Sequence, residues 1–157
     1  MEHDSGLPQP TATLFAGVNA ALGLPGKAPR LLSPLVLAYI GDTVYDLYVR
    51  TQLVLSSDAG VHGLHVQSAG RVCAAAQAKA LRAVERMLLE DELYIYRRGR
   101  NSHMGTVPKH ASIADYRTAT GFEALLGYLY LSGQDARLSA ILRAALTPDL
   151  KEETDHA

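Results

Sequence analysis

Two apolar stretches of this sequence carry acidic residues, and this combination limits what the chain can form. The first runs from Leu35 to Val49 and is apolar on nearly every side of the helix that it predicts, which is typical of a buried helix. Asp42 lies near its middle and Asp46 follows one turn later, so both carboxylates project from one face. Acids in such a helix need a partner, a cation or a shifted pKa.

The second apolar stretch runs from Phe122 to Leu131, and its one acid is Glu123. Small residues lie close to the acids of both stretches and would let two helix backbones approach each other: Ala38, Gly41, Ala124 and Gly127. Such a crossing would bring Asp42 and Glu123 together. Two facing carboxylates in a core repel each other unless a proton or a metal ion lies between them.

Composition restricts the class of protein. The 157 residues suffice for one domain with a core, and 48% hydrophobic and 20% charged residues suit a globular protein. The net charge of −1 excludes a polycation, so nucleic-acid binding would need a local patch. Cys73 is the one cysteine, which excludes an internal disulfide and fits a reducing compartment. With no signal peptide or membrane-length apolar run, we expect a cytoplasmic protein.

The sequence predicts helices and no strand, so the expected fold class is all-α. Ser33 and Pro34 predict the start of the first core helix, which should end near Leu55. The other core helices are predicted over residues 61–65, 67–89, 112–131 and 135–146. Ser112 matches an N-cap, Ser132-Gly133 an end signal, and Thr147-Pro148 a stop.

Three regions are expected along the chain: a flexible N-terminal extension (1–30), a main helical domain (31–148) and an acidic tail (149–157), expected to be disordered from Lys151 on. Within the extension, apolar residues at helical spacing allow a short helix that docks on the domain or covers a partner: Leu14, Phe15, Val18 and Leu22.

Basic residues gather in two segments. Residues 97–110 contain no acid, and their glycines and proline predict a flexible basic loop that follows a nucleic-acid backbone, or else an ordinary polar loop. The 67–89 helix would carry a basic face, either solvated or bound to phosphates: Arg71, Lys79, Arg82 and Arg86.

Several chemistries lack their motifs. The sequence has no zinc cluster, phosphate-binding glycine loop or G-x-S-x-G elbow, and His62 and His65 share a helical face without a clear third ligand. Carboxylate oxygens and waters are what magnesium takes from a protein, and the metal can activate water. The acids beside a basic loop therefore indicate phosphate-ester or phosphodiester hydrolysis. The alternative is a structural pairing of Asp42 and Glu123 with Arg50, Arg117 or a backbone donor.

Residues 37–42, Leu-Ala-Tyr-Ile-Gly-Asp, followed by residues 122–129, Phe-Glu-Ala-Leu-Leu-Gly-Tyr-Leu, resemble the catalytic domain of the ribonuclease III family. Three further segments resemble its small branch, Mini-ribonuclease III: Arg98–Asn101, Pro108-Lys109 and Tyr116-Arg117. The resemblance covers about residues 31–146, so the main helical domain would be a ribonuclease III-like catalytic domain.

The resemblance implies an all-helical homodimer that cleaves double-stranded RNA with magnesium, for which manganese can substitute. Asp42 would be the catalytic aspartate and Glu123 its metal-binding partner, with Asp46 as an outer-shell group. The implied substrate is the 23S ribosomal RNA precursor, with a ribosomal protein as a possible helper. The expected RNA-binding residues are Arg97, Arg98, Arg100, Asn101, Lys109, Arg71 and Lys79.

The chain also departs from the larger relatives. Ala38 and Thr120 stand where those enzymes have acids, so the carboxylate set is reduced and the number of metal ions is open. Two other functions compete: a non-catalytic RNA-binding or ribosome-associated protein on the same fold, and a helical nucleotide pyrophosphatase, which would show denser acidic clusters. Retention of Asp42 and Glu123 disfavours the first.

Overall fold

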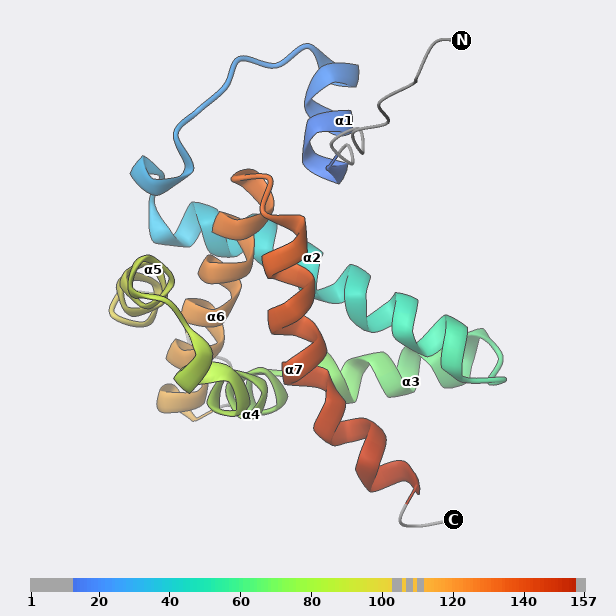
Figure 1. Ribbon diagram of the computed structural model, residues 1–157. Coiled ribbons are helices and arrows are strands. Elements are labelled where there is room, and N and C mark those ends of the chain that lie inside the picture. Colours follow the sequence, from blue (N-terminus) through green and yellow to red (C-terminus); the bar gives the residue numbers. More distant parts are fainter. Residues whose placement is uncertain (1–12, 103–105, 107–108, 110–111, 155–157) are drawn as a thin grey trace, which may run out of the picture.

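The computed structural model describes residues 13–102, 106, 109 and 112–154, and this part of the chain is helical without a strand, which confirms the all-α fold class. Figure 1 shows the arrangement. The α-helices are α1 (Leu14–Leu22), α2 (Pro34–Ser56), α3 (Val61–Val72), α4 (Ala74–Val84), α5 (Glu90–Arg100), α6 (Ile113–Leu131) and α7 (Asp135–Thr154), with 3-10 turns η1 (Pro29–Leu31) and η2 (Glu85–Met87).

Helix α6 is the centre of the fold, because α2, α4, α5 and α7 all pack on it. It is buried along most of its length, and the Phe122 ring lies edge-to-face on Tyr45 of α2 with 5.8 Å between ring centroids. Its start follows the sequence prediction, since the Ser112 side chain accepts a hydrogen bond from the Asp115 amide at 3.0 Å. Its end is also confirmed, with Gly133 in the left-handed region at φ 68°.

Helices α2 and α6 touch backbone to backbone, as the small residues predict. A Cβ atom added to Gly41 would lie 1.7 Å from the carbonyl oxygen of Glu123. A Cβ atom on Gly127 would lie 2.0 Å from the carbonyl oxygen of Leu37. Only glycine therefore fits at either position, and the crossing places the two acid-bearing segments side by side.

Burial of α2 on all sides is the first wrong prediction for the single chain. One face packs on α6, with contacts to α3 and α5, but the opposite face is open. Tyr39 is 81% exposed, and Leu35, Val36 and Leu47 are exposed as well. In the described part of the chain, no element covers these side chains, so apolar composition alone overestimated the burial.

The predicted 67–89 helix is also wrong, because the chain turns at Cys73, whose backbone is extended at ψ 158°. Hydrogen bonds from residues distant in sequence or beyond the break satisfy the last carbonyls of α3. The Tyr45 hydroxyl donates to the Arg71 carbonyl at 3.1 Å, and the Gln77 side-chain amide donates to the Val72 carbonyl at 2.9 Å. Helix α4 is thereby free to turn and pack on α6.

Two other boundaries differ from the predictions. Residues 97–100 form the last turn of α5 rather than the start of a loop. Helix α7 continues to Thr154, so Thr147-Pro148 does not stop it and residues 151–154 are helical rather than disordered. Proline removes one amide donor from a helix, which costs stability without necessarily ending the helix.

The docking helix expected in the extension is present as α1. It lies beside the junction of α6 and α7 (Figure 1), where Phe15 packs edge-to-face on Tyr130 at 5.7 Å and the Leu14 amide donates to the Asp135 carboxylate at 3.2 Å. None of the described helices has the length and apolar character needed to cross a membrane.

Candidate active site

A pocket of about 610 Å³ contains both acids that the sequence singled out. We call it the carboxylate pocket. It lies where α2, the break between α3 and α4, and the first half of α6 meet, and its lining includes Asp42, Cys73, Gln77, Asp115, Tyr116 and Glu123. Asp115, predicted only as a capping residue, also faces this pocket, with its carboxylate 3.7 Å from the Arg82 guanidinium.

The close crossing at Gly41 brings the Glu123 carboxyl to the Asp42 carboxylate. Glu123 is partly buried, while Asp42 is exposed to solvent. Burial raises the pKa of Glu123 to about 8, and the negative charge of Asp42 and the hydrogen bond between the two carboxyl groups act in the same direction. At neutral pH, Glu123 therefore holds a proton that it donates to Asp42, and the facing carboxyl groups avoid repulsion.

A divalent cation would compete with this proton, which makes cation binding pH-dependent. We expect magnesium affinity to rise as the pH approaches about 8 and to level off above it, because the pKa of Glu123 lies there. Below that pH, binding should release a proton. Calorimetry in two buffers of different ionisation enthalpy measures the release, and Asp46→Asn, which leaves both pocket carboxyl groups in place, should release the same amount. Affinity that does not change with pH would contradict the shared proton.

The same shift predicts how the metal-free protein responds to pH. A folded-state pKa of about 8 against an ordinary value of 4.5 gives Glu123 a stabilising contribution that is complete below 4.5 and is lost as the pH rises through 8. The donor set is small, since the described ranges hold no group of three or more His, Cys, Asp or Glu residues placed to bind a metal ion. Two carboxylates suit magnesium, which keeps several waters and takes further ligands from substrate phosphates.

The other predicted acid, Asp46, is not brought into the pocket. Its carboxylate pairs with Arg50 one turn later, at 3.0 Å. Arg50 is thus paired with Asp46. This disfavours the structural pairing of Asp42 with Arg50 that the sequence left open.

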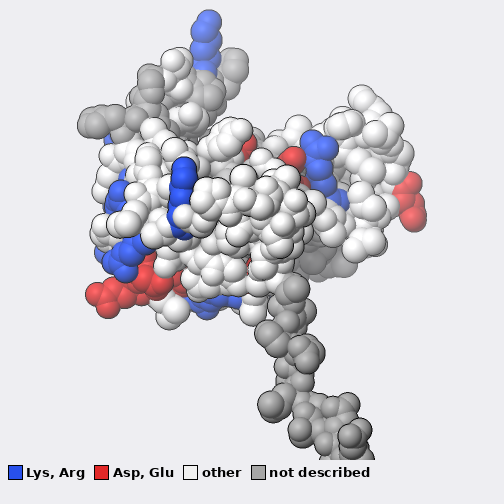
Figure 2. All heavy atoms as spheres, turned by 90° about the horizontal axis from the view of Figure 1, so that it is seen from above, with Lys and Arg blue, Asp and Glu red and all other residues white. Residues whose placement is uncertain are grey.

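The predicted RNA-binding residues occupy two separate places. Arg97, Arg98 and Arg100 lie on the last turn of α5, followed by exposed Asn101 and exposed Lys109. Residues 103–105, 107–108, 110 and 111 of the predicted loop lie outside the described residues. In the view of Figure 2, Lys and Arg side chains are spread over several places rather than gathered in one continuous patch. On this face, the described cations form no continuous basic surface.

Arg30, which the sequence reasoning did not single out, joins this end of α5. Its guanidinium lies over the Tyr94 ring at 4.9 Å, and that of Arg98 lies over the same ring at 5.5 Å. Arg98 also donates to the Arg30 carbonyl at 3.3 Å. No local sequence signal pointed to Arg30, because it reaches Tyr94 only in the folded chain.

Arg71 and Lys79 do not share one basic face. Arg71 is on α3, partly buried, and donates to the Gln52 side chain at 2.9 Å. Lys79 is exposed on α4, beyond the break at Cys73.

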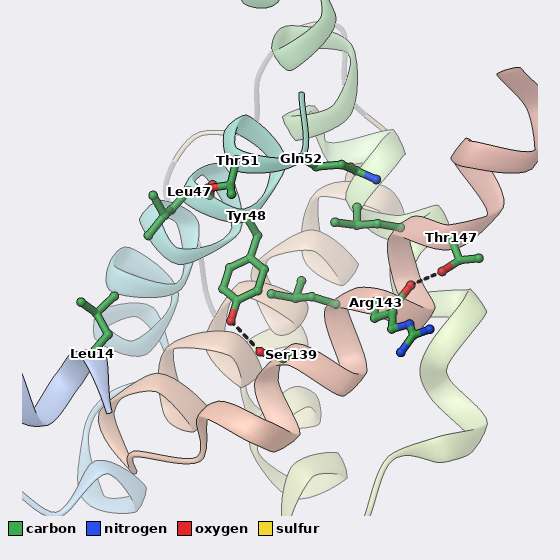
Figure 3. A pocket seen from close by; sticks show the side chains of 10 residues that line it. Leu14, Leu47, Tyr48, Thr51, Gln52, Ser139, Arg143 and Thr147 are labelled. Atoms are coloured by element: carbon green, nitrogen blue, oxygen red, sulfur yellow. Dashed lines mark hydrogen bonds between the residues drawn. The ribbon is translucent and has the colours of Figure 1, made fainter. Parts of the chain in front are cut away.

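A second pocket, of about 510 Å³, lies between α2 and α7, with Leu14 of α1 at its edge. Figure 3 shows its lining, in which the hydroxyls of Tyr48 and Ser139 are hydrogen-bonded at 2.9 Å. Among the described residues that line it, Arg143 is the one charged side chain, so this pocket offers no pair of carboxylates. Of these two pockets, the carboxylate pocket is the one whose described lining offers a pair of facing carboxyl groups.

A protein family and several known proteins are similar to this chain. Residues 35–134 match the model of the ribonuclease III domain family. The chain is 50% identical over 115 residues to the Mini-ribonuclease 3 of Thermoanaerobacter sp. (strain X514), covering 73% of this chain and 81% of that protein. It is 44% identical over 126 residues to the Mini-ribonuclease 3 of Clostridium tetani (strain Massachusetts / E88), covering 80% and 82%. The crystal structure of protein FN1578 from Fusobacterium nucleatum is similar in fold, with a TM-score of 0.71 at 25% identity, over 79% of this chain and 99% of that one.

Proposed function

The chain belongs to the ribonuclease III family, in its Mini-ribonuclease 3 branch, and is an endoribonuclease of that type; on this premise we propose that it cleaves double-stranded RNA with magnesium and trims 23S ribosomal RNA precursors. The observation that carries the proposal is the meeting of Asp42 and Glu123 in one pocket. A purely RNA-binding protein would have no use for two acids held against each other there.

In this proposal, Asp42 and Glu123 hold the magnesium ion, and manganese can take its place. When bound there, the ion would supply the acidity that activates a water and the charge that stabilises the leaving oxygen of the phosphodiester. Asp42 is open to solvent and can meet the substrate, whereas Glu123 must first lose its proton. Asp46 points to Arg50, which does not favour a direct role.

Incubation of the protein with labelled RNA tests the function. Cleavage of a duplex with magnesium, its loss with a chelator, and no cleavage of the separated strands are the expected results. Binding of the duplex without cleavage would support the non-catalytic alternative. A duplex formed by the ends of a 23S precursor, compared with an unrelated duplex, tests the substrate, and addition of ribosomal proteins to that precursor tests the predicted helper.

The basic end of α5 is proposed to bind phosphates of any RNA sequence, because A-form RNA hides its major groove and leaves the backbone and groove shape to be recognised. We expect a triple replacement of Arg97, Arg100 and Lys109 by Ala to weaken duplex binding and to reduce the salt slope by about one for each phosphate that is no longer neutralised. Arg98 is left intact because it also contacts Arg30 and Tyr94.

Binding of one duplex across a salt series measures this effect. The matched control is a triple replacement of exposed cations outside both basic segments, namely Lys27, Arg50 and Arg143. Equal affinity and equal slope for both triple variants would contradict a special role for the end of α5.

The open apolar face of α2 supports a homodimer. Contiguous exposed apolar side chains of this kind mark interaction surfaces, and a two-fold pair would place one active site at each RNA strand. We expect a sedimentation mass of twice the 16.9 kDa chain mass at micromolar concentration, and a single-chain mass for Tyr39→Glu. A monomeric native protein would contradict the dimer. A cytoplasmic location is proposed with the ribosomal substrate.

A further inference from the structure

Gln77 has an unsatisfied side chain at the carboxylate pocket. It lies on the first turn of α4 and is 3% exposed. Its side-chain Nε2 donates to the Val72 carbonyl at 2.9 Å, while its Oε1 is buried and has no hydrogen-bond partner among the described residues. Turning the amide over would set its oxygen against the Val72 carbonyl oxygen, so the bond to Val72 determines which atom remains unpaired.

This arrangement is costly unless something pairs with the oxygen. A buried acceptor without a partner costs about 1–3 kcal/mol, and an apolar side chain of similar shape would avoid that cost. An unpaired buried group in a native protein often indicates a water or an ion that joins it. Gln77 lines the same pocket as Asp42 and Glu123, so the missing donor would come from the site itself.

The donor can be identified from the chemistry of the site. Magnesium held by two carboxylates keeps several waters, and each bound water is a hydrogen-bond donor that needs an acceptor nearby. The oxygens of Asp42 and Glu123 would be used by the metal, Asp46 is paired with Arg50, and the Asp115 carboxylate lies 3.7 Å from the Arg82 guanidinium. The Gln77 oxygen is the buried acceptor that is left.

We propose that the Gln77 amide oxygen accepts a hydrogen bond from a magnesium-bound water in the carboxylate pocket and thereby positions the hydration shell for hydrolysis. The inference rests on the proposed magnesium-dependent function. Gln77 is a positioning residue in this account: it touches neither the metal nor the RNA, and its bond to Val72 holds its oxygen in one place.

The test compares Gln77→Met with Gln67→Met on the exposed side of α3. Gln77→Met keeps the approximate shape but removes both the acceptor and the donor to the Val72 carbonyl, so its melting temperature is measured in parallel. Without magnesium, Gln77→Met should fold and bind duplex RNA as the native protein does. Its magnesium affinity, measured by calorimetry without RNA, should fall roughly 10–100-fold, as is typical for groups that orient metal ligands. The cleavage rate at saturating RNA should fall with it and recover partly at high magnesium, and Gln67→Met should match the native protein in all three measurements.

A measurement on the native protein does not depend on how the variant folds. In ¹⁵N-labelled protein, the side-chain amide signals of Gln77 should shift on addition of magnesium, and those of Gln67 should not. The inference is overturned if the Gln77 signals do not shift, or if Gln77→Met keeps the native magnesium affinity. It is also overturned if the magnesium affinity and cleavage rate of Gln77→Met fall only as far as its lower melting temperature explains. If the native protein itself neither binds magnesium nor cleaves a duplex, the proposed function fails; if it does both and Gln77→Met equals it, only the role of Gln77 fails.

Discussion

Asp42→Asn is expected to abolish RNA cleavage while leaving the fold and RNA binding largely intact. The substitution keeps the shape of the side chain but removes the charge that holds the metal. A metal ion contributes several kcal/mol to stabilising the charged transition state, and each 1.4 kcal/mol or so corresponds to a factor of ten. The loss in single-turnover rate should therefore be at least about a thousandfold, and Glu123→Gln should behave similarly.

The readout combines cleavage rate, duplex affinity and melting temperature. Asp46→Asn is the matched control, because it makes the same change one turn along α2, at a residue outside the lining of the carboxylate pocket. Asp42 is exposed, so Asp42→Asn should melt close to the native protein, whereas removal of one partner of a buried ion pair would cost roughly 3–5 kcal/mol. An Asp42→Asn protein that cuts RNA at the native rate would refute the assignment.

Gly41→Ala is expected to prevent the native packing of α2 on α6. The added methyl group would lie 1.7 Å from the Glu123 carbonyl oxygen, which belongs to a helix backbone and cannot turn aside as a flexible side chain can. Overpacking a core costs typically 1–3 kcal/mol when side chains can adjust, so we expect about 3 kcal/mol or more here. For a chain of this size, that lowers the melting temperature by about 6–12 °C or more.

Gly70→Ala is the matched control for this prediction. Gly70 is also in a helix, but nothing lies within 4 Å of the position its Cβ atom would take. Alanine is a better helix former than glycine, so this variant should be more stable by about 0.5–1 kcal/mol. Thermal unfolding followed by circular dichroism compares the two variants, and equal melting temperatures would contradict the close crossing of α2 and α6.

Local signals in the sequence determined the start of α2 after Ser33, the limits of α6 and the presence of α1. Each depends on residues within one or two turns. Pro34 at the first position starts α2, where the Ser33 side chain makes no capping bond. The Ser112 and Thr13 side chains cap α6 and α1, and Gly133 takes the left-handed conformation after α6. The crossing near Gly41 could also be predicted, because small residues in two apolar helices allow the helix backbones to approach each other closely.

Other features depended on groups that are far apart in the sequence. At the break near Cys73, the Tyr45 hydroxyl of α2 donates a hydrogen bond to the Arg71 carbonyl at the end of α3. The sequence pattern within 67–89 cannot predict this bond, because Tyr45 lies outside that segment. The open face of α2 depends on which elements pack beside it, whereas composition reports only that it is apolar.

The site shows the same division. The sequence itself singled out Asp42, Asp46 and Glu123, because carboxylates are costly in apolar helices. The structure places Asp42 and Glu123 in one pocket and pairs Asp46 with Arg50. Only the tertiary structure decided their state: burial and the approach of Asp42 raise the pKa of Glu123, and the turn at Cys73 leaves the Gln77 oxygen unpaired at the same pocket. A residue's identity is local, but desolvation and hydrogen-bond partners arise only when α2, α4 and α6 pack together.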